Sequence, residues 1–137
     1  MEIIVSQQQS AASSVTIMRL KGSLDGNSYQ YFITEAQKLY DSGSRNLLVD
    51  MTDLIFLSSA GLGALHRTAR VFRGEDSAKM EEGWAALRAM GREGNVLQEH
   101  IKLLNPSDSI QNVLDTVGFK NFLAIFSDMS EAIASFD

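Results

Sequence analysis

The sequence predicts an α/β domain built on a partly parallel β-sheet. Two observations carry this prediction. The chain opens with two apolar runs of the kind that form strands, and from its middle onward strand-like runs alternate with amphipathic helical segments. Such alternation is typical of crossover connections, which place successive strands side by side in parallel. With 137 residues, the chain is long enough for one domain with a core of its own.

The first third of the chain is predicted to form two strands and a helix. Residues 3–5 and 15–20 are strand-like, and the polar residues 7–14 between them are typical of a loop or hairpin connection. A helix is expected over 27–41, because apolar residues recur there at intervals of three and four and the pattern stops at Gly43. These apolar residues are Tyr29, Phe32, Ile33, Ala36, Leu39 and Tyr40.

The middle of the chain is predicted to form a strand that runs into a second helix. Residues 47–51 are expected to be a short buried strand, which 54–57 continue toward Ser58 and Ser59. The helix is expected to begin at one of these serines, whose side-chain oxygen can accept a hydrogen bond from a free N–H group of the first turn. Its apolar stripe consists of Leu62, Leu65, Ala69 and Phe72.

The last third is predicted to contain two more strands and two more helices. Strands are expected at 101–104 and 122–126. A helix is expected to begin at Asp108, which together with Gln111 resembles a capping box, and to end at Gly118. The terminal helix is expected to open at Asp128 with Glu131 and to bury Met129, Ala132, Ile133 and Phe136.

Residues 74–98 interrupt this regular order. Glycines and mixed charges replace the periodic pattern, so we expect 1–137 to be a single domain with an insertion at about 74–98. A short amphipathic helix over 78–90 is predicted within the insertion. Its tryptophan, Trp84, is interpreted either as part of a stripe that covers the edge of the domain or as an anchor for a partner.

The composition disfavours several classes of function. The absence of cysteine removes disulfides and thiolate chemistry and is consistent with a cytoplasmic protein. A net charge of −5 disfavours nucleic-acid binding, because Arg67, Arg70 and Arg73 make only a short basic stripe, expected to be the solvent-facing side of the second helix. The N-terminus does not resemble a signal peptide. No segment approaches the roughly 20 apolar residues needed to cross a bilayer.

No catalytic or cofactor motif is found in the sequence. The esterase elbow needs a glycine two residues before its serine, and Leu57 holds that position before Ser59. Gly61 and Gly63 lack the third glycine of a dinucleotide-binding loop, and no Walker sequence occurs. His66 is expected to be partly exposed about two helical turns from Ser59, too far for a hydrogen bond. We therefore expect a protein that is not an enzyme and holds no cofactor or metal.

The order of elements and three motifs resemble the STAS domain family of anti-sigma factor antagonists. The motifs are Gly22-Ser23-Leu24-Asp25, Leu48-Val49-Asp50-Met51 and Phe56-Leu57-Ser58-Ser59-Ala60-Gly61-Leu62. The resemblance covers nearly the whole chain. It implies a single STAS domain, with a mixed, mainly parallel sheet of about four to five strands and about four helices packed mainly on one face.

The resemblance also implies a phosphorylation site. The family's helix opens with Asp-Ser-Ser/Thr-Gly-Leu-Gly, and the serine after the aspartate is phosphorylated by a serine kinase that is itself the anti-sigma factor. Aligning the glycine pair that begins at Gly61 places Ser59 at the phosphorylated position. Ser58 then replaces the aspartate, and Ala60 replaces the second hydroxyl residue. Asp25 matches an acid that lies beside the phosphorylated serine in the family.

The implied function is a binary switch. With Ser59 unmodified, the helix N-terminus and the apolar residues beside it, Leu57 and Leu62, are expected to be free to dock against the kinase. Phosphorylation is expected to abolish this docking, and a phosphoserine phosphatase to restore it. The expected partner-binding residues are Asp25, Leu57, Ser58, Gly61 and Leu62. The alternative is a STAS scaffold or subunit of a stress-sensing or lipid-transport complex that is not phosphorylated, since Ser58 replaces the aspartate.

Overall fold

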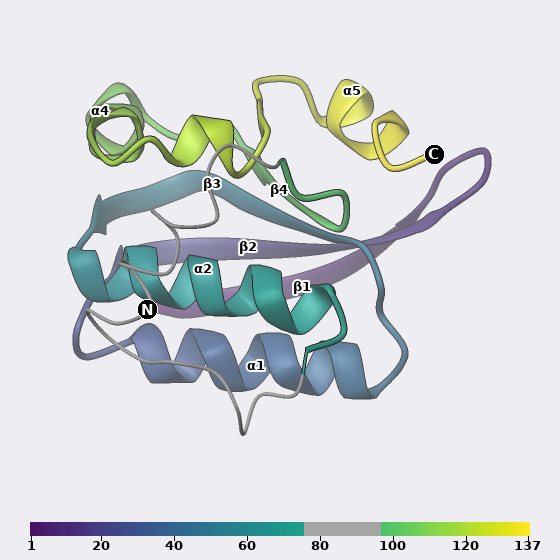
Figure 1. The fold of residues 1–137 in the computed structure, drawn as a ribbon, viewed down its shortest axis with the longest axis horizontal. Helices are drawn as coiled ribbons and strands as arrows, with labels where there is room; N and C mark the ends of the chain where they lie inside the picture. Colours follow the sequence, from purple (N-terminus) through teal and green to yellow (C-terminus); the bar gives the residue numbers. More distant parts are fainter. Residues whose placement is uncertain (76–96) are drawn as a thin grey trace.

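The computed structural model describes residues 1–75 and 97–137, and these form one five-stranded sheet. The strands lie in the order of the sequence, from β1 to β5, and the first four are labelled in Figure 1. β1 pairs with β2 in antiparallel fashion, and each later pair of neighbours is parallel. The strands span Glu2–Gln9, Ser14–Leu24, Leu47–Leu57, Ile101–Leu104 and Ile125–Phe126. The prediction of a mixed, mainly parallel sheet is confirmed.

The helices follow the strands as the alternating pattern predicts. The described helices are α1 at Tyr29–Asp41, α2 at Ser59–Phe72, α4 at Asp108–Thr116, the short 3-10 helix η2 at Phe119–Asn121, and α5 at Met129–Ala134. α1 and α2 lie side by side (Figure 1). α1 ends just before Gly43, whose φ of +114° is a backbone conformation that glycine adopts without strain.

Two apolar clusters fill the two faces of the sheet. In β3, Leu47 and Val49 belong to the larger cluster, to which α1, α2 and α4 contribute their buried residues. Leu48 belongs to the smaller cluster, together with Ala132 of α5. Successive side chains of a strand point to opposite faces, so α5 covers the face opposite to the other three helices. Most helices therefore pack on one face of the sheet, as the resemblance implies.

The first loop is shorter than the sequence pattern predicts. β1 continues through Gln9, so the polar residues at 7–9 are part of a strand rather than of the predicted connection over 7–14. They form a regular ladder with β2, in which Gln7 lies opposite Thr16. Polar residues are compatible with a strand here because β1 is at the edge of the sheet and most of its residues are exposed.

The predicted strand over 122–126 is also too long. β5 consists of Ile125 and Phe126 alone, because Phe122 and Leu123 follow η2 into the core instead of joining the sheet. An apolar run of this length does not distinguish a strand from another buried segment.

Two further predictions, the cap of α4 and the burial of Met129 at the start of α5, are wrong. α4 is capped by Ser107, whose Oγ accepts a hydrogen bond from the backbone N–H of Ile110 at 3.3 Å, so Asp108 is the first helical residue and not the cap. α5 is capped by Asp128, as predicted. Met129, which was expected to be buried, is 37% exposed because it begins the short helix at its open end.

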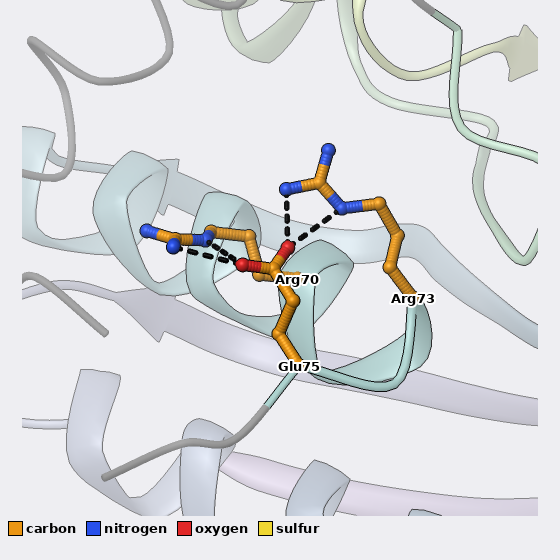
Figure 2. Close-up of polar contacts among 3 residues, drawn as sticks. All are labelled: Arg70, Arg73 and Glu75. Atoms are coloured by element: carbon orange, nitrogen blue, oxygen red, sulfur yellow. Dashed lines mark hydrogen bonds and ion pairs between the residues drawn. The ribbon is translucent and has the colours of Figure 1, made fainter. Parts of the chain in front are cut away.

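The C-terminal end of α2 is closed by its own backbone and by an acidic residue (Figure 2). Gly74, with φ of +88°, donates its N–H to Val71, and the N–H of Glu75 reaches the carbonyl of Arg70, as in a Schellman motif. The Glu75 carboxylate lies between Arg70 and Arg73 and binds both guanidinium groups. The predicted solvent-facing stripe of arginines is therefore partly wrong, since the Arg70 side chain is 16% exposed and paired.

The remaining predictions about the insertion cannot be placed in the fold. The predicted helix over 78–90 and Trp84 lie outside the described residues. No helix in the described part of the chain has the length and apolar character needed to cross a membrane.

Candidate functional site

The two serines at the start of α2 have different environments. Ser58 is the N-cap: its backbone is extended, with φ of −96° and ψ of 175°, and its Oγ accepts the N–H of Gly61 at 3.3 Å. Ser59 is the first residue of the helix and is exposed, and its hydroxyl forms no hydrogen bond with the described residues. The hydroxyl of Ser59 is thus presented to solvent at a helix N-terminus, where the partial positive charge of the helix favours an anion.

A close backbone contact fixes the position of this helix start. The N–H of Ser58 donates to the carbonyl of Leu24, the last residue of β2, at 3.0 Å. A Cβ atom added to Gly61 would lie 2.5 Å from the same carbonyl and 2.7 Å from Cδ1 of Leu57. Position 61 therefore requires glycine, because any side chain would push α2 away from the end of β2.

Asp25 lies at the same edge of the sheet as the serines. Leu24 and Leu57 are the last register pair between β2 and β3, so Asp25 and Ser58 follow at equivalent positions. The carboxylate of Asp25 accepts the N–H of Asn27 at 2.9 Å and shapes the turn that leads into α1. The fold therefore brings the backbones of the two predicted site segments together. The Asp25 carboxylate itself forms hydrogen bonds within its own turn, with the N–H of Asn27 and the hydroxyl of Ser28.

The expectation that Leu57 and Leu62 are free to dock is wrong. Each is 3% exposed and belongs to the larger core cluster. The apolar surface beside the serines is instead formed by Ile55 and Phe56, which are 74% and 53% exposed. We refer to these two residues as the exposed pair.

A β-bulge explains why the exposed pair faces solvent. In the ladder between β2 and β3, Gly22 lies opposite Leu54 and Ser23 opposite Phe56, so Ile55 is an extra residue in β3. Strict alternation of buried and exposed side chains fails at such a point. The only hint in the sequence is the unbroken apolar run at 54–57, which does not show which of its members are outside.

The second half of β3 is also open on one side within the described structure. β4 pairs with β3 only as far as the register pair Asp50 and Leu104. Beyond this point β3 continues to Leu57 along β2 alone, among the strands described. The exposed pair therefore lies on a strand segment that has a described neighbour on one side only and that leads directly into Ser58 and Ser59.

The histidines do not form a catalytic site with the serines. His66 is fully buried, against the expectation of partial exposure, and its ring packs against that of Phe122, with centroids 5.3 Å apart and planes tilted by 34°. His100 lies at the other end of the sheet, where its Nδ1 is 3.0 Å from Oδ1 of Asn46, the residue before β3. No group of three residues among histidine, aspartate and glutamate is placed to hold a metal ion in the described parts of the chain.

The fold and the site together define a single-sheet α/β domain with an exposed serine at the start of its second helix. The model of the STAS domain family matches residues 5–77, which run from the middle of β1 through α2 and include both serines. The chain therefore belongs to the STAS domain family. No curated protein matches the chain.

Solved structures share this fold at low sequence identity. An anti-sigma factor antagonist from Mycobacterium paratuberculosis is 12% identical, with a TM-score of 0.64 over 98% of this chain and 94% of that one. A putative anti-sigma factor antagonist from Thermotoga maritima is 15% identical, with a TM-score of 0.61 over 94% and 91%. The antagonist SpoIIAA in its unphosphorylated form is 17% identical, with a TM-score of 0.56 over 95% and 93%. At these identities the likeness establishes the fold.

Proposed function

We propose that this chain is an anti-sigma factor antagonist that binds its partner when Ser59 is unmodified and releases it when Ser59 is phosphorylated. The observation that carries the proposal is that the two serines have different roles. Ser58 caps the helix, and this leaves the exposed hydroxyl of Ser59 available as a phosphate acceptor. The similar structures support it, because one of them is an antagonist solved in both unphosphorylated and phosphorylated forms.

The effect of the phosphate follows from its charge and position. It adds about −1.5 to −2 charge at the start of α2, where the helix dipole favours an anion by about 0.3–1 kcal/mol. The fold therefore tolerates the modification. A partner that covers Ser59 must instead desolvate this charge, which costs more than the dipole returns.

The exposed pair is the proposed apolar contact of the partner. Ile55 and Phe56 immediately precede the serines, and a partner that buries these side chains also covers the start of α2. Apolar contacts at the centre of an interface commonly supply most of its binding energy. This surface replaces Leu57 and Leu62, whose burial prevents direct contact. Ser58 and Gly61 contribute by keeping the start of α2 against the end of β2. Asp25 contributes by shaping the turn that follows β2.

The partner is a serine-kinase anti-sigma factor, and a phosphoserine phosphatase reverses the modification. In this scheme the chain is a cytoplasmic binding module, and the chemistry of phosphoryl transfer belongs to the kinase. The alternative is a STAS scaffold or subunit of a stress-sensing or lipid-transport complex that is never phosphorylated. One observation favours it: Ser58 occupies the position of the family's aspartate and serves as the cap.

The experiment begins with capture of partners by the unmodified protein and mass spectrometry of the modified residue. Ser59→Ala and Ser59→Asp then test the switch, with Ser58→Ala as the matched control. We expect a captured kinase to phosphorylate wild type and Ser58→Ala but not Ser59→Ala. We also expect Ser59→Ala to retain binding and Ser59→Asp to lose it. Equal partner binding by both Ser59 variants would contradict the proposed switch. Partner binding by wild type without any phosphate incorporation would favour the alternative.

A further inference from the structure

The first strand forms an unusually open edge of the sheet. β1, at Glu2–Gln9, pairs with β2 on one side, and no described strand pairs with its other side. Seven of its eight residues are exposed. Among them Ile4 and Val5 are 40% and 42% exposed, although β-branched apolar residues are favoured where a strand packs against a neighbour. The opposite edge, β5, has only two residues and offers much less backbone.

This edge lacks the devices that normally prevent strand pairing. Proteins protect edge strands with lysine, proline, bulges or very short strands. β1 contains none of these: its eight residues include no proline, lysine, arginine or glycine, and its ladder with β2 runs from Glu2 to Gln9 without a register shift. The outer N–H and C=O groups of β1 therefore form a row that no bulge interrupts and that can accept another strand.

From these features we propose that the outer edge of β1 pairs with β1 of a second copy of this chain, so that two sheets join into one. The pairing is antiparallel and has two-fold symmetry. Alternate residues of an edge strand direct their backbone groups outward, and these are the same residues in both copies. The symmetry axis must therefore pass through a residue rather than between two residues.

An axis through Val5 satisfies the chemistry of the strand. It places the two Val5 side chains opposite each other at the centre, as an apolar cross-strand pair. The flanking pairs are Ile4 with Ser6, Ile3 with Gln7, and Glu2 with Gln8.

The charge pattern favours a second copy as the occupant. Glu2 is the one ionisable side chain of β1, and in this register each Glu2 faces a neutral Gln8 amide that can donate to it. Like charges directly opposite each other, which would destabilise a ladder, do not occur. A strand that carried several charges of one sign would instead require a partner of opposite charge.

The proposed dimer leaves the start of α2 accessible. Ser59 follows β3, and β2 separates β3 from β1 in the sheet (Figure 1). The two copies therefore present two separate helix starts, and the pairing is independent of phosphorylation. A failure of the dimer leaves the proposed switch untouched, and a failure of the switch leaves the dimer untouched.

The first test measures the mass of the full chain by sedimentation equilibrium from micromolar to millimolar concentration. We expect wild type to show a concentration-dependent dimer and Val5→Lys to be monomeric, because it places two ammonium groups opposite each other. Thr34→Lys, which adds the same charge at an exposed position of α1, is the matched control and is expected to dimerise like wild type. Circular dichroism verifies that each variant is folded.

The second test remains decisive if Val5→Lys fails to fold. The chain contains no cysteine, so a single introduced thiol can cross-link only to its counterpart in another copy. Directly opposite residues of an antiparallel ladder lie within the Cα separation that a disulfide spans. We expect Val5→Cys to give a covalent dimer on mild oxidation and Thr34→Cys to remain monomeric. A monomeric wild type throughout the concentration range, or a dimer in which Val5→Cys does not cross-link faster than Thr34→Cys, would overturn the proposal.

Discussion

Ser58 and Ser59 are neighbours with the same side chain, but only Ser58 has a structural role as the helix cap. The Ser58 side chain is turned back to the helix and satisfies the N–H of Gly61. Ser59 has helical backbone geometry and points its hydroxyl to solvent. The same side-chain chemistry is thus used for stability at one position and is available for modification at the next.

The first prediction concerns the stability of the two serine variants. Ser58→Ala removes the cap and is expected to lower the free energy of unfolding by about 1 kcal/mol. Ser59→Ala removes no hydrogen bond to the described residues, and its effect is expected to stay within about 0.5 kcal/mol. Urea denaturation with a common slope measures both values. A larger loss in Ser59→Ala than in Ser58→Ala would show that the cap has been assigned to the wrong serine.

The second prediction concerns Gly61, where the helix touches the carbonyl of Leu24. Gly61→Ala would place its Cβ atom 2.5 Å from that oxygen, so the backbone must move to admit the side chain. Overpacking of this kind is expected to lower the free energy of unfolding by about 1–3 kcal/mol. Gly26→Ala is the control, because an added Cβ meets nothing within 4 Å there. Equal effects of the two substitutions in thermal unfolding would contradict the close contact.

At the scale of the element, α2 is held at both of its ends. Its start is fixed by the Ser58 cap and the contact with β2, and its last turn is closed by Gly74 and by the ion pairs of Glu75 with Arg70 and Arg73. β3 is similarly divided. Its first half is paired on both sides, whereas its second half carries the exposed pair on a bulged segment. A helix that is held at both ends and an exposed strand end therefore meet at the proposed site.

The third prediction concerns the ion pairs at the end of α2. Burial raises the pKa of Glu75, but hydrogen bonds and charge from Arg70 and Arg73 outweigh this effect and hold its pKa below the ordinary value. Because the folded pKa is lowered, the stabilisation is present above the ordinary pKa of glutamate and is lost as the pH falls through the folded value.

Glu75→Gln tests this linkage. About a third of the Glu75 and Arg73 side chains is exposed, so solvent screens the pairs and the expected loss near neutral pH is about 0.2–1 kcal/mol. The difference in unfolding free energy between wild type and Glu75→Gln should shrink on acidification. Chemical denaturation at neutral and acidic pH measures it, and a difference that grows as the pH falls would have the wrong sign.

At the scale of the whole molecule, helices cover the two faces of the sheet, and two strand edges are left uncovered by the described strands. α1, α2 and α4 cover one face, and α5 covers part of the other. In the described part of the chain, no strand pairs with the outer edge of β1 or with the free side of the last residues of β3, and these two edges lie on different strands of the sheet. The proposed switch and the proposed contact with a second copy therefore use different surfaces of the same domain.

The fourth prediction concerns partner binding by the exposed pair. The double variant Ile55→Ser and Phe56→Ser is expected to lose most of the partner binding shown by wild type, because it removes the apolar surface beside Ser59. Its unfolding free energy should change little, since both side chains are already exposed. Met129→Ser, at an exposed apolar position on α5, is the control for binding and stability. Undiminished capture of the partner by the double variant would exclude this surface as the contact.

The sequence predicted the elements well where periodicity is strong. The helical stripe that ends at Gly43 and the start of a helix at Ser58 or Ser59 both agree with the structure, because they depend on local geometry and on hydrogen bonds within one turn. The predicted strand over 122–126 and the predicted connection over 7–14 are both longer than the observed ones. In both cases the state of the segment depends on neighbours that are distant in sequence, namely the core around Phe122 and the ladder with β2.

The sequence by itself determined the fold class, the order of the elements and the position of the serine pair, since these follow from hydrophobic periodicity and from capping chemistry. Only the tertiary structure decided which serine caps, which apolar residues beside the serines are exposed, and which edge of the sheet is open. The reason is that exposure depends on the register between strands, and the bulge at Ile55 changes which side chains face solvent without leaving a distinct signal in the sequence.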